Sequence, residues 1–76
     1  MKTVLDVLKG IRPEFDFTTS DDFIADGMLD SFDVVTLINE LDSRYGISIA
    51  GTDILPENVR SIAAITQLLH KYGIAP

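Results

Sequence analysis

The run from Ser31 to Tyr45 is the feature that most limits how this chain folds. Its apolar residues recur every three or four positions, at Val34, Leu37, Ile38, Leu41 and Tyr45. This spacing places them on one face of an α-helix. Asp30 stands before the run as a good N-cap, with Asp33 at the third helical position, and Gly46 follows as a stop signal. We therefore expect a long amphipathic helix that must bury one face against other elements.

Two further helices are predicted from the same kind of pattern. One runs from Met1 to Ile11, with Thr3 as a cap and Pro13 shortly after its end. Its apolar face consists of Val4, Val7, Leu8 and Ile11. The other runs from its cap Ser61 to about Tyr72. Its apolar face consists of Ile62, Ile65, Leu68, Leu69 and Tyr72.

The connections add one short helix and a long first loop. Ile54 to Asn58 has room for one helical turn, capped by Thr52 or Asp53. The loop covers residues 14–29, with a helical turn possible around Asp21 to Phe23, and apolar side chains that can pin it to the core: Phe15, Phe17, Phe23, Ile24, Met28 and Leu29. Ile47-Ser48-Ile49 alternates too briefly to support a strand. The predicted fold is an all-α bundle of three main helices and one short helix.

Length and composition restrict the function classes. The 76 residues fit one domain, 1–76, and the lack of cysteine excludes disulfides and thiolate metal sites. The net charge of −6 disfavours nucleic acid and anionic membranes as partners and favours basic protein surfaces. No signal peptide and no apolar run of about 20 residues is visible, so we expect a cytoplasmic protein with no membrane insertion.

The sequence lacks the residues that most catalytic and metal-binding sites require. His70 is the single histidine and is expected at the surface near a helix end, so a nucleophilic triad lacks its parts. The carboxylates are expected to be solvated rather than catalytic, and a carboxylate-dependent hydrolase is a weaker alternative. Aligning Gly27 with the glycine of a calcium-binding loop puts Ile24 at a ligand position, so no metal site is expected.

Ser31 is the remaining candidate. Asp30-Ser31-Phe32-Asp33 can be read simply as a helix start, because all of these polar residues suit that place. Asp30 already serves as the cap, however, so the Ser31 hydroxyl is redundant there and is expected to point outward. A helix N-terminus presents free N–H groups, which suit an attached phosphate.

The stretch from Phe23 to Tyr72 resembles the acyl carrier protein family, including its peptidyl and D-alanyl carrier relatives. The resemblance is carried by Gly27-Met28-Leu29-Asp30-Ser31-Phe32-Asp33, by Val35, Leu37, Ile38 and Leu41, by Tyr45-Gly46-Ile47-Ser48-Ile49, and by Asn58-Val59-Arg60-Ser61-Ile62. It implies a four-helix bundle with a long first loop. It also implies that Ser31 accepts 4'-phosphopantetheine from coenzyme A through a separate phosphopantetheinyl transferase. The arm's thiol would then carry acyl or aminoacyl groups as thioesters, so the chain would be a carrier and not an enzyme.

The resemblance makes the helix after Ser31 the recognition helix for a loading ligase and for downstream synthase enzymes. The residues expected to face partners are Asp30, Phe32, Asp33, Val35, Asn39 and Asp42, with core packing the alternative for Val35. Thr36, Asn39 and Ser43 replace some of the charge usual in fatty-acid carriers, which favours a specialised carrier. We expect a monomer. The alternative is a small helical interaction module without a prosthetic group.

Overall fold

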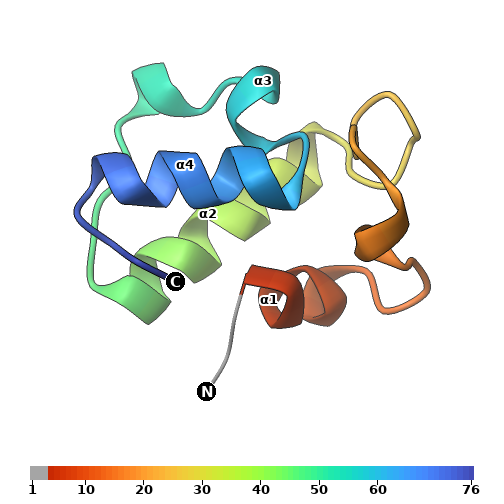
Figure 1. Cartoon of the computed structure of the whole chain (residues 1–76), viewed down its shortest axis with the longest axis horizontal. Coiled ribbons are helices and arrows are strands. Elements are labelled where there is room, and N and C mark those ends of the chain that lie inside the picture. The colour runs from red at the N-terminus through yellow and green to blue at the C-terminus, as the bar shows by residue number, and fades with distance from the viewer. Residues whose placement is uncertain (1–3) are drawn as a thin grey trace.

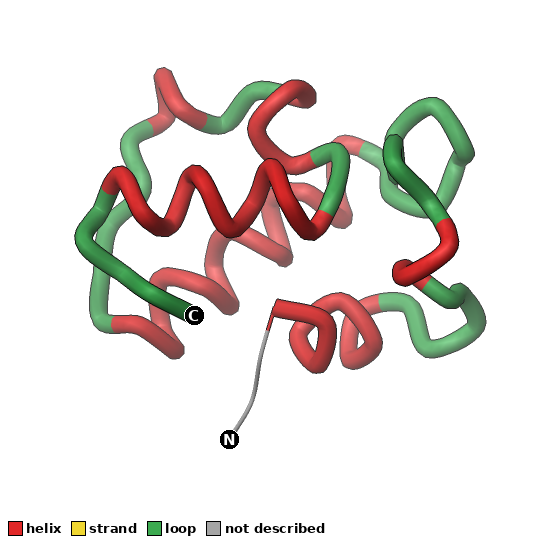
Figure 2. The backbone as a smooth tube through the Cα atoms, viewed as in Figure 1, coloured by secondary structure: helices red, strands yellow, loops and turns green. Residues whose placement is uncertain are grey.

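The computed structural model of the chain describes residues 4–76. Within this range it consists of four α-helices, two short 3-10 turns and connecting loops, with no strand (Figures 1 and 2). The helices are α1 (Val4–Ile11), α2 (Ser31–Tyr45), α3 (Pro56–Val59) and α4 (Ile62–Lys71); the 3-10 turns are η1 (Phe17–Thr19) and η2 (Gly51–Asp53). The predicted all-α fold, with three main helices and one short one, is confirmed.

Helix α2 begins and ends at the predicted residues. Asp30 is its N-cap and accepts a hydrogen bond from the Asp33 amide, while Gly46 is its C-cap with φ 65°. This left-handed conformation is one that glycine adopts without steric cost. The cap predicted at Ser61 is also confirmed, because its side chain accepts a hydrogen bond from the Ala64 amide at the start of α4. The cap predicted at Thr3 lies outside the described residues.

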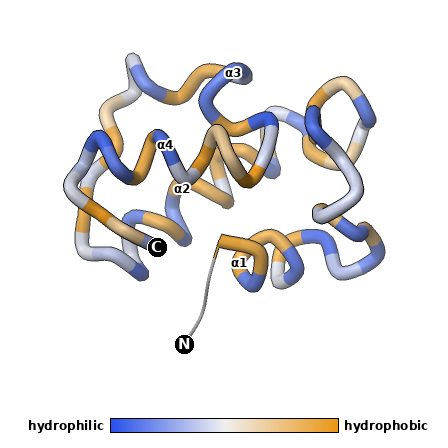
Figure 3. Tube along the Cα trace, in the orientation of Figure 1, coloured by the Kyte–Doolittle hydropathy of each residue, from blue (hydrophilic) through white to orange (hydrophobic). Residues whose placement is uncertain are grey.

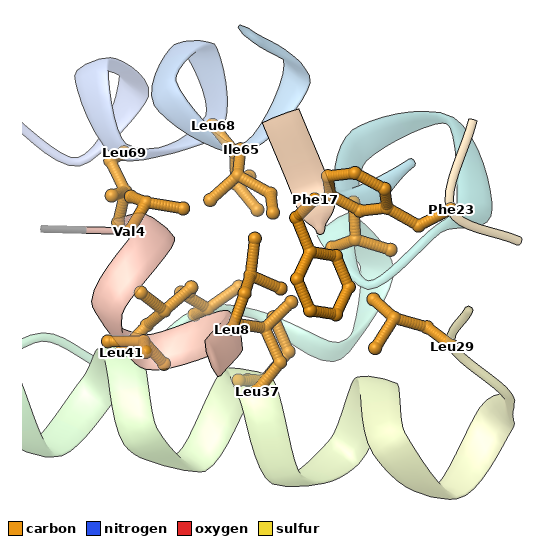
Figure 4. Close-up of a cluster of buried hydrophobic side chains, with 14 of the residues drawn as sticks. Val4, Leu8, Phe17, Phe23, Leu29, Leu37, Leu41, Ile65, Leu68 and Leu69 are labelled. Atoms are coloured by element: carbon orange, nitrogen blue, oxygen red, sulfur yellow. The ribbon is translucent and has the colours of Figure 1, made fainter. Parts of the chain in front are cut away.

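The core lies where α1, α2 and α4 meet. Helix α1 packs against both α2 and α4, and α3 packs against α4. Leu8, Leu37, Leu41, Ile65 and Leu69 have no exposed surface, and Figure 4 shows their side chains converging between the helices. Figure 3 shows apolar and polar residues interleaved along α1, α2 and α4, as expected for helices that bury one face. Packing of apolar side chains, mostly aliphatic and with no disulfide, therefore holds the elements together.

The long first loop is pinned as its aromatic residues predict. Phe17 and Phe23 are buried and meet edge to face, with ring centroids 5.0 Å apart. Met28 and Leu29 are buried too, while Phe15 and Ile24 are partly buried. The loop holds η1, which Asp16 caps and which was not anticipated. The turn suggested around Asp21 to Phe23 is also present, because the Asp26 amide donates to the Asp22 carbonyl at 3.0 Å. The loop is anchored along its length and holds the start of α2 in place.

The segment before α4 differs from the prediction in its helix start. Helix α3 begins at Pro56, its N-cap is Leu55, and no side chain caps it. Thr52 and Asp53, the expected caps, lie in η2 instead. Asp53 is occupied elsewhere, because its carboxylate accepts hydrogen bonds from Lys71 and from the Tyr72 hydroxyl at 2.7 and 2.6 Å. Proline suits the first helical position since its missing N–H would be unsatisfied there anyway.

Candidate functional site at the start of α2

Ser31 is the first residue of α2 and is exposed. The capping function belongs to its neighbour, because Asp30 and Asp33 form a reciprocal capping box. The Asp33 amide donates to Asp30 Oδ1 at 2.9 Å, and the Asp30 amide donates to Asp33 Oδ2 at 3.2 Å. The Ser31 hydroxyl is thus left for other chemistry at a helix end whose dipole favours negative charge.

A groove opens beside Ser31 between α2, the first loop and α3. Its volume is about 220 Å³. Apart from Ser31 its lining is apolar: Ile24, Val34, Val35, Ile54, Pro56 and Val59. A long aliphatic arm with a few amide groups fits such a lining better than a compact charged ligand does. A larger groove, of about 470 Å³, lies between α3 and α4, but its lining is mostly polar and does not include Ser31.

Two large apolar side chains close to this helix start are exposed, and a third lies at the start of α3. Phe32 is 80% exposed, Val35 56% and Leu55 40%. The exposure of Val35 shows that it does not belong to the core, which was the alternative reading of this residue. Val35 lines the groove next to Ser31, whereas Phe32 lines a second groove between α1 and α2. The two residues therefore present apolar surface on both sides of α2, of the kind that partner proteins cover.

The polar residues expected to face partners divide into two groups. Asp30 and Asn39 are exposed. Asp42 is partly buried, and its Oδ1 accepts a hydrogen bond from the Ile49 amide at 3.0 Å, which ties the loop after α2 to the helix.

Asp33 is only 7% exposed and pairs with Arg12. The expectation that Asp33 faces a partner is therefore not met, because its carboxylate is turned inward to complete the helix start.

Arg12 is the residue at this site that sequence reasoning missed. It follows α1 directly and reaches the start of α2, where its Nε and Nη2 lie 2.9 and 2.8 Å from Asp33 Oδ2. Burial by itself raises the pKa of Asp33, but hydrogen bonds from Arg12 and from the Asp30 amide, with the nearby positive charge, hold that pKa below its usual value. The Asp33 bond in turn raises the pKa of Arg12. The sequence offers only a basic residue next to a helix end as a signal.

Residues 4–76 contain neither a cluster of metal-ligating side chains nor a helix able to cross a membrane. Between residues 4 and 76, no group of three or more His, Asp or Glu side chains is arranged to hold a metal ion. In the same range, no helix has the length and apolar character needed to cross a membrane. His70 is exposed in the last turn of α4, as predicted.

Comparison with known proteins identifies the family. A family model described as a phosphopantetheine attachment site matches residues 1–69. No curated protein and no solved structure matches the chain. The matched range contains the exposed serine, its apolar groove and all of the helices except the end of α4. This chain belongs to the family of carrier domains that hold 4'-phosphopantetheine covalently, and it is a carrier and not an enzyme.

Proposed function

We propose that Ser31 is the residue that holds 4'-phosphopantetheine, and that residues 1–76 form a single carrier domain, monomeric and cytoplasmic. The observation that carries this assignment is the position of the Ser31 hydroxyl, exposed at the first residue of α2 beside an apolar groove. Asp30 caps the helix, so esterifying Ser31 removes no capping bond. A phosphodiester there meets the free N–H groups and positive dipole end of the helix.

When attached, the group supplies a flexible arm that ends in a thiol, on which acyl or aminoacyl cargo is held as a thioester. The residues of the chain then have two tasks. Ser31 anchors the arm at one fixed point, and the apolar lining of the groove shields the part of the arm or cargo that lies along it. Partners reach the arm over the surface that carries Phe32, Val35 and the exposed Asp30 and Asn39.

The partners proposed are a phosphopantetheinyl transferase, a loading ligase and the synthase enzymes of a biosynthetic pathway, with no role for nucleic acid. Fatty acid, polyketide and nonribosomal peptide pathways all use such carriers. Uncharged Thr36, Asn39 and Ser43 along α2, where fatty-acid carriers usually have more charge, support a specialised acyl or aminoacyl carrier over a fatty-acid carrier.

Intact mass spectrometry tests the assignment of Ser31. The chain is incubated with coenzyme A and a broad-specificity phosphopantetheinyl transferase. We expect a mass gain of one phosphopantetheine group in the wild-type chain and none in Ser31→Ala. Ser48→Ala serves as the matched control, because it removes another exposed serine away from the start of α2 and should still gain the group. No gain in the wild-type chain would support the interaction module instead, and a gain in Ser31→Ala would move the attachment to another residue.

A further inference from the structure

The guanidinium of Arg12 joins the end of α1 to the start of α2 across 21 positions of sequence. Two of its nitrogens lie within 3.0 Å of one oxygen, Asp33 Oδ2. Its Nη2 also lies 3.7 Å from Asp30 Oδ2, and its Nη1 lies 3.6 Å from Glu14 Oε2. Arg12 is thus surrounded by three carboxylates, and two of them belong to the residues on either side of the Ser31-Phe32 pair.

The same Asp33 oxygen that receives Arg12 also holds the backbone before Ser31. Asp33 Oδ2 accepts the Asp30 amide, and Asp30 is covalently joined to Ser31. Asp33 is the one charged residue in the buried set of residues 4–76, and a buried carboxylate needs a compensating partner. Without Arg12 this carboxylate has to take up a proton or turn toward water, and either change weakens its bond to the Asp30 amide. Arg12 is therefore linked through Asp33 to the Asp30 backbone, which directly precedes Ser31.

We propose that Arg12 is a positioning residue for the loading of Ser31. By holding Asp33 it fixes the backbone at Asp30, and so it presents the Ser31 oxygen in one orientation to the phosphopantetheinyl transferase. In the transfer, the Ser31 oxygen bonds to the phosphorus next to the pantetheine arm of coenzyme A, and the pyrophosphate bond breaks. The adenosine bisphosphate portion of coenzyme A leaves, and the hydroxyl proton passes to a base of the transferase. This inference rests on the proposed attachment at Ser31. Nucleophiles lose rate steeply when they are misplaced, because a bound geometry close to attack is part of the rate. Arg12 itself is half-exposed and lies on the α1 side of the helix start, away from the apolar groove.

The test measures initial rates of loading against carrier concentration for wild-type, Arg12→Gln, Arg12→Lys and Arg44→Gln chains. Arg44 is exposed in the last turn of α2, at the opposite end of the helix from Ser31. Arg44→Gln is therefore a control that removes one positive charge far from Ser31. All rates are measured at a temperature where circular dichroism shows each variant folded. Loading to completion with excess transferase is scored separately, because failure of the wild-type chain to load at all contradicts the attachment site and not the role of Arg12.

We expect kcat to fall about tenfold in Arg12→Gln, since misplacement by about 1 Å can cost up to about a hundredfold, while KM stays within about twofold. Arg12→Lys keeps the charge but has one nitrogen in place of two, so its kcat should fall about threefold. Arg44→Gln should match wild type. Amide hydrogen exchange at Asp30 should be faster in Arg12→Gln, because Asp33 holds that amide.

Each of the following outcomes would overturn the proposal. A wild-type kcat in Arg12→Gln means that the ion pair does not position Ser31. A loss confined to KM means that Arg12 contacts the transferase directly. An equal loss in Arg44→Gln means that overall charge, and not the contact with Asp33, controls loading. If Arg12→Gln does not fold, a wild-type kcat in Arg12→Lys overturns the proposal on its own.

Discussion

The carboxylates of Asp30 and Asp33 each accept the other residue's backbone amide, at 2.9 and 3.2 Å. These two hydrogen bonds cap the start of α2, and the Ser31 hydroxyl takes no part in them. The helix start is therefore stabilised independently of the residue that we propose to be modified. A group can then be attached to the Ser31 oxygen without breaking the hydrogen bonds that cap the helix.

Removing the cap should destabilise the domain, whereas removing the serine should not. We expect Asp30→Ala to lower the free energy of unfolding by about 1 kcal/mol, because one helix amide loses its acceptor. Ser31→Ala, at an exposed position outside the cap, should change it by less than about 0.5 kcal/mol. Urea unfolding followed by circular dichroism measures both. A larger loss in Ser31→Ala than in Asp30→Ala would show that the hydroxyl, and not the carboxylate, holds the helix start.

The exposed apolar residues should matter for docking and not for folding. We expect Phe32→Ala and Val35→Ala each to raise the KM for loading by the transferase about fivefold or more, as loss of a contact worth over about 1 kcal/mol does. Their melting temperatures should stay near wild type, because both side chains are largely exposed. Gln67→Ala, on the exposed side of α4, is the matched control. Unchanged KM values in both variants would place the docking surface elsewhere.

Truncating the core should unfold much of the population. Leu37 and Ile65 have no exposed surface and lie on facing helices α2 and α4. Leu37→Ala or Ile65→Ala should cost about 2–5 kcal/mol, through lost burial and the cavity left behind. A domain of this size has little more than that in reserve. Thermal melts followed by circular dichroism give the result, and a wild-type melt in either variant would contradict the core described above.

Acid should weaken the fold through its paired carboxylates. The pKa of Asp33 is lowered by Arg12 and the Asp30 amide against the effect of burial, and the pKa of Asp53 is lowered by Lys71 and Tyr72. A folded-state pKa below the unfolded value of 3.8 means that the unfolded chain binds protons first as pH falls. The stabilisation is therefore complete above this value and is lost as pH falls through the folded-state pKa values.

Melting temperatures from neutral pH down to about pH 3 test this sign. We expect a flat region at neutral pH and a steep fall below about pH 4. Asp33→Asn removes one of the titrating groups, so its melting temperature should start lower and fall less over the same range. A wild-type slope in that variant would show that Asp33 makes no contribution to acid sensitivity.

The elements of this fold were predictable because their signals are local. The period of apolar residues defined α2 and α4, and the caps at Asp30 and Ser61 follow from side chains that bond to amides three residues away. The start of α3 was predicted less well. A short helix has few turns over which a pattern can repeat, and there Pro56 at the first position decided the boundary while Asp53 bonded to the end of α4.

The sequence by itself determined the helices, the aromatic anchors of the first loop and the serine at the start of α2, since each depends on residues close together in the chain. Only the tertiary structure decided that Asp33 turns inward, that Val35 stays exposed and that Arg12 lies at the site. Those outcomes depend on which face of α2 the end of α1 covers. Contacts between residues 21 positions apart leave no periodic mark in the sequence, because they arise from packing and not from local backbone geometry.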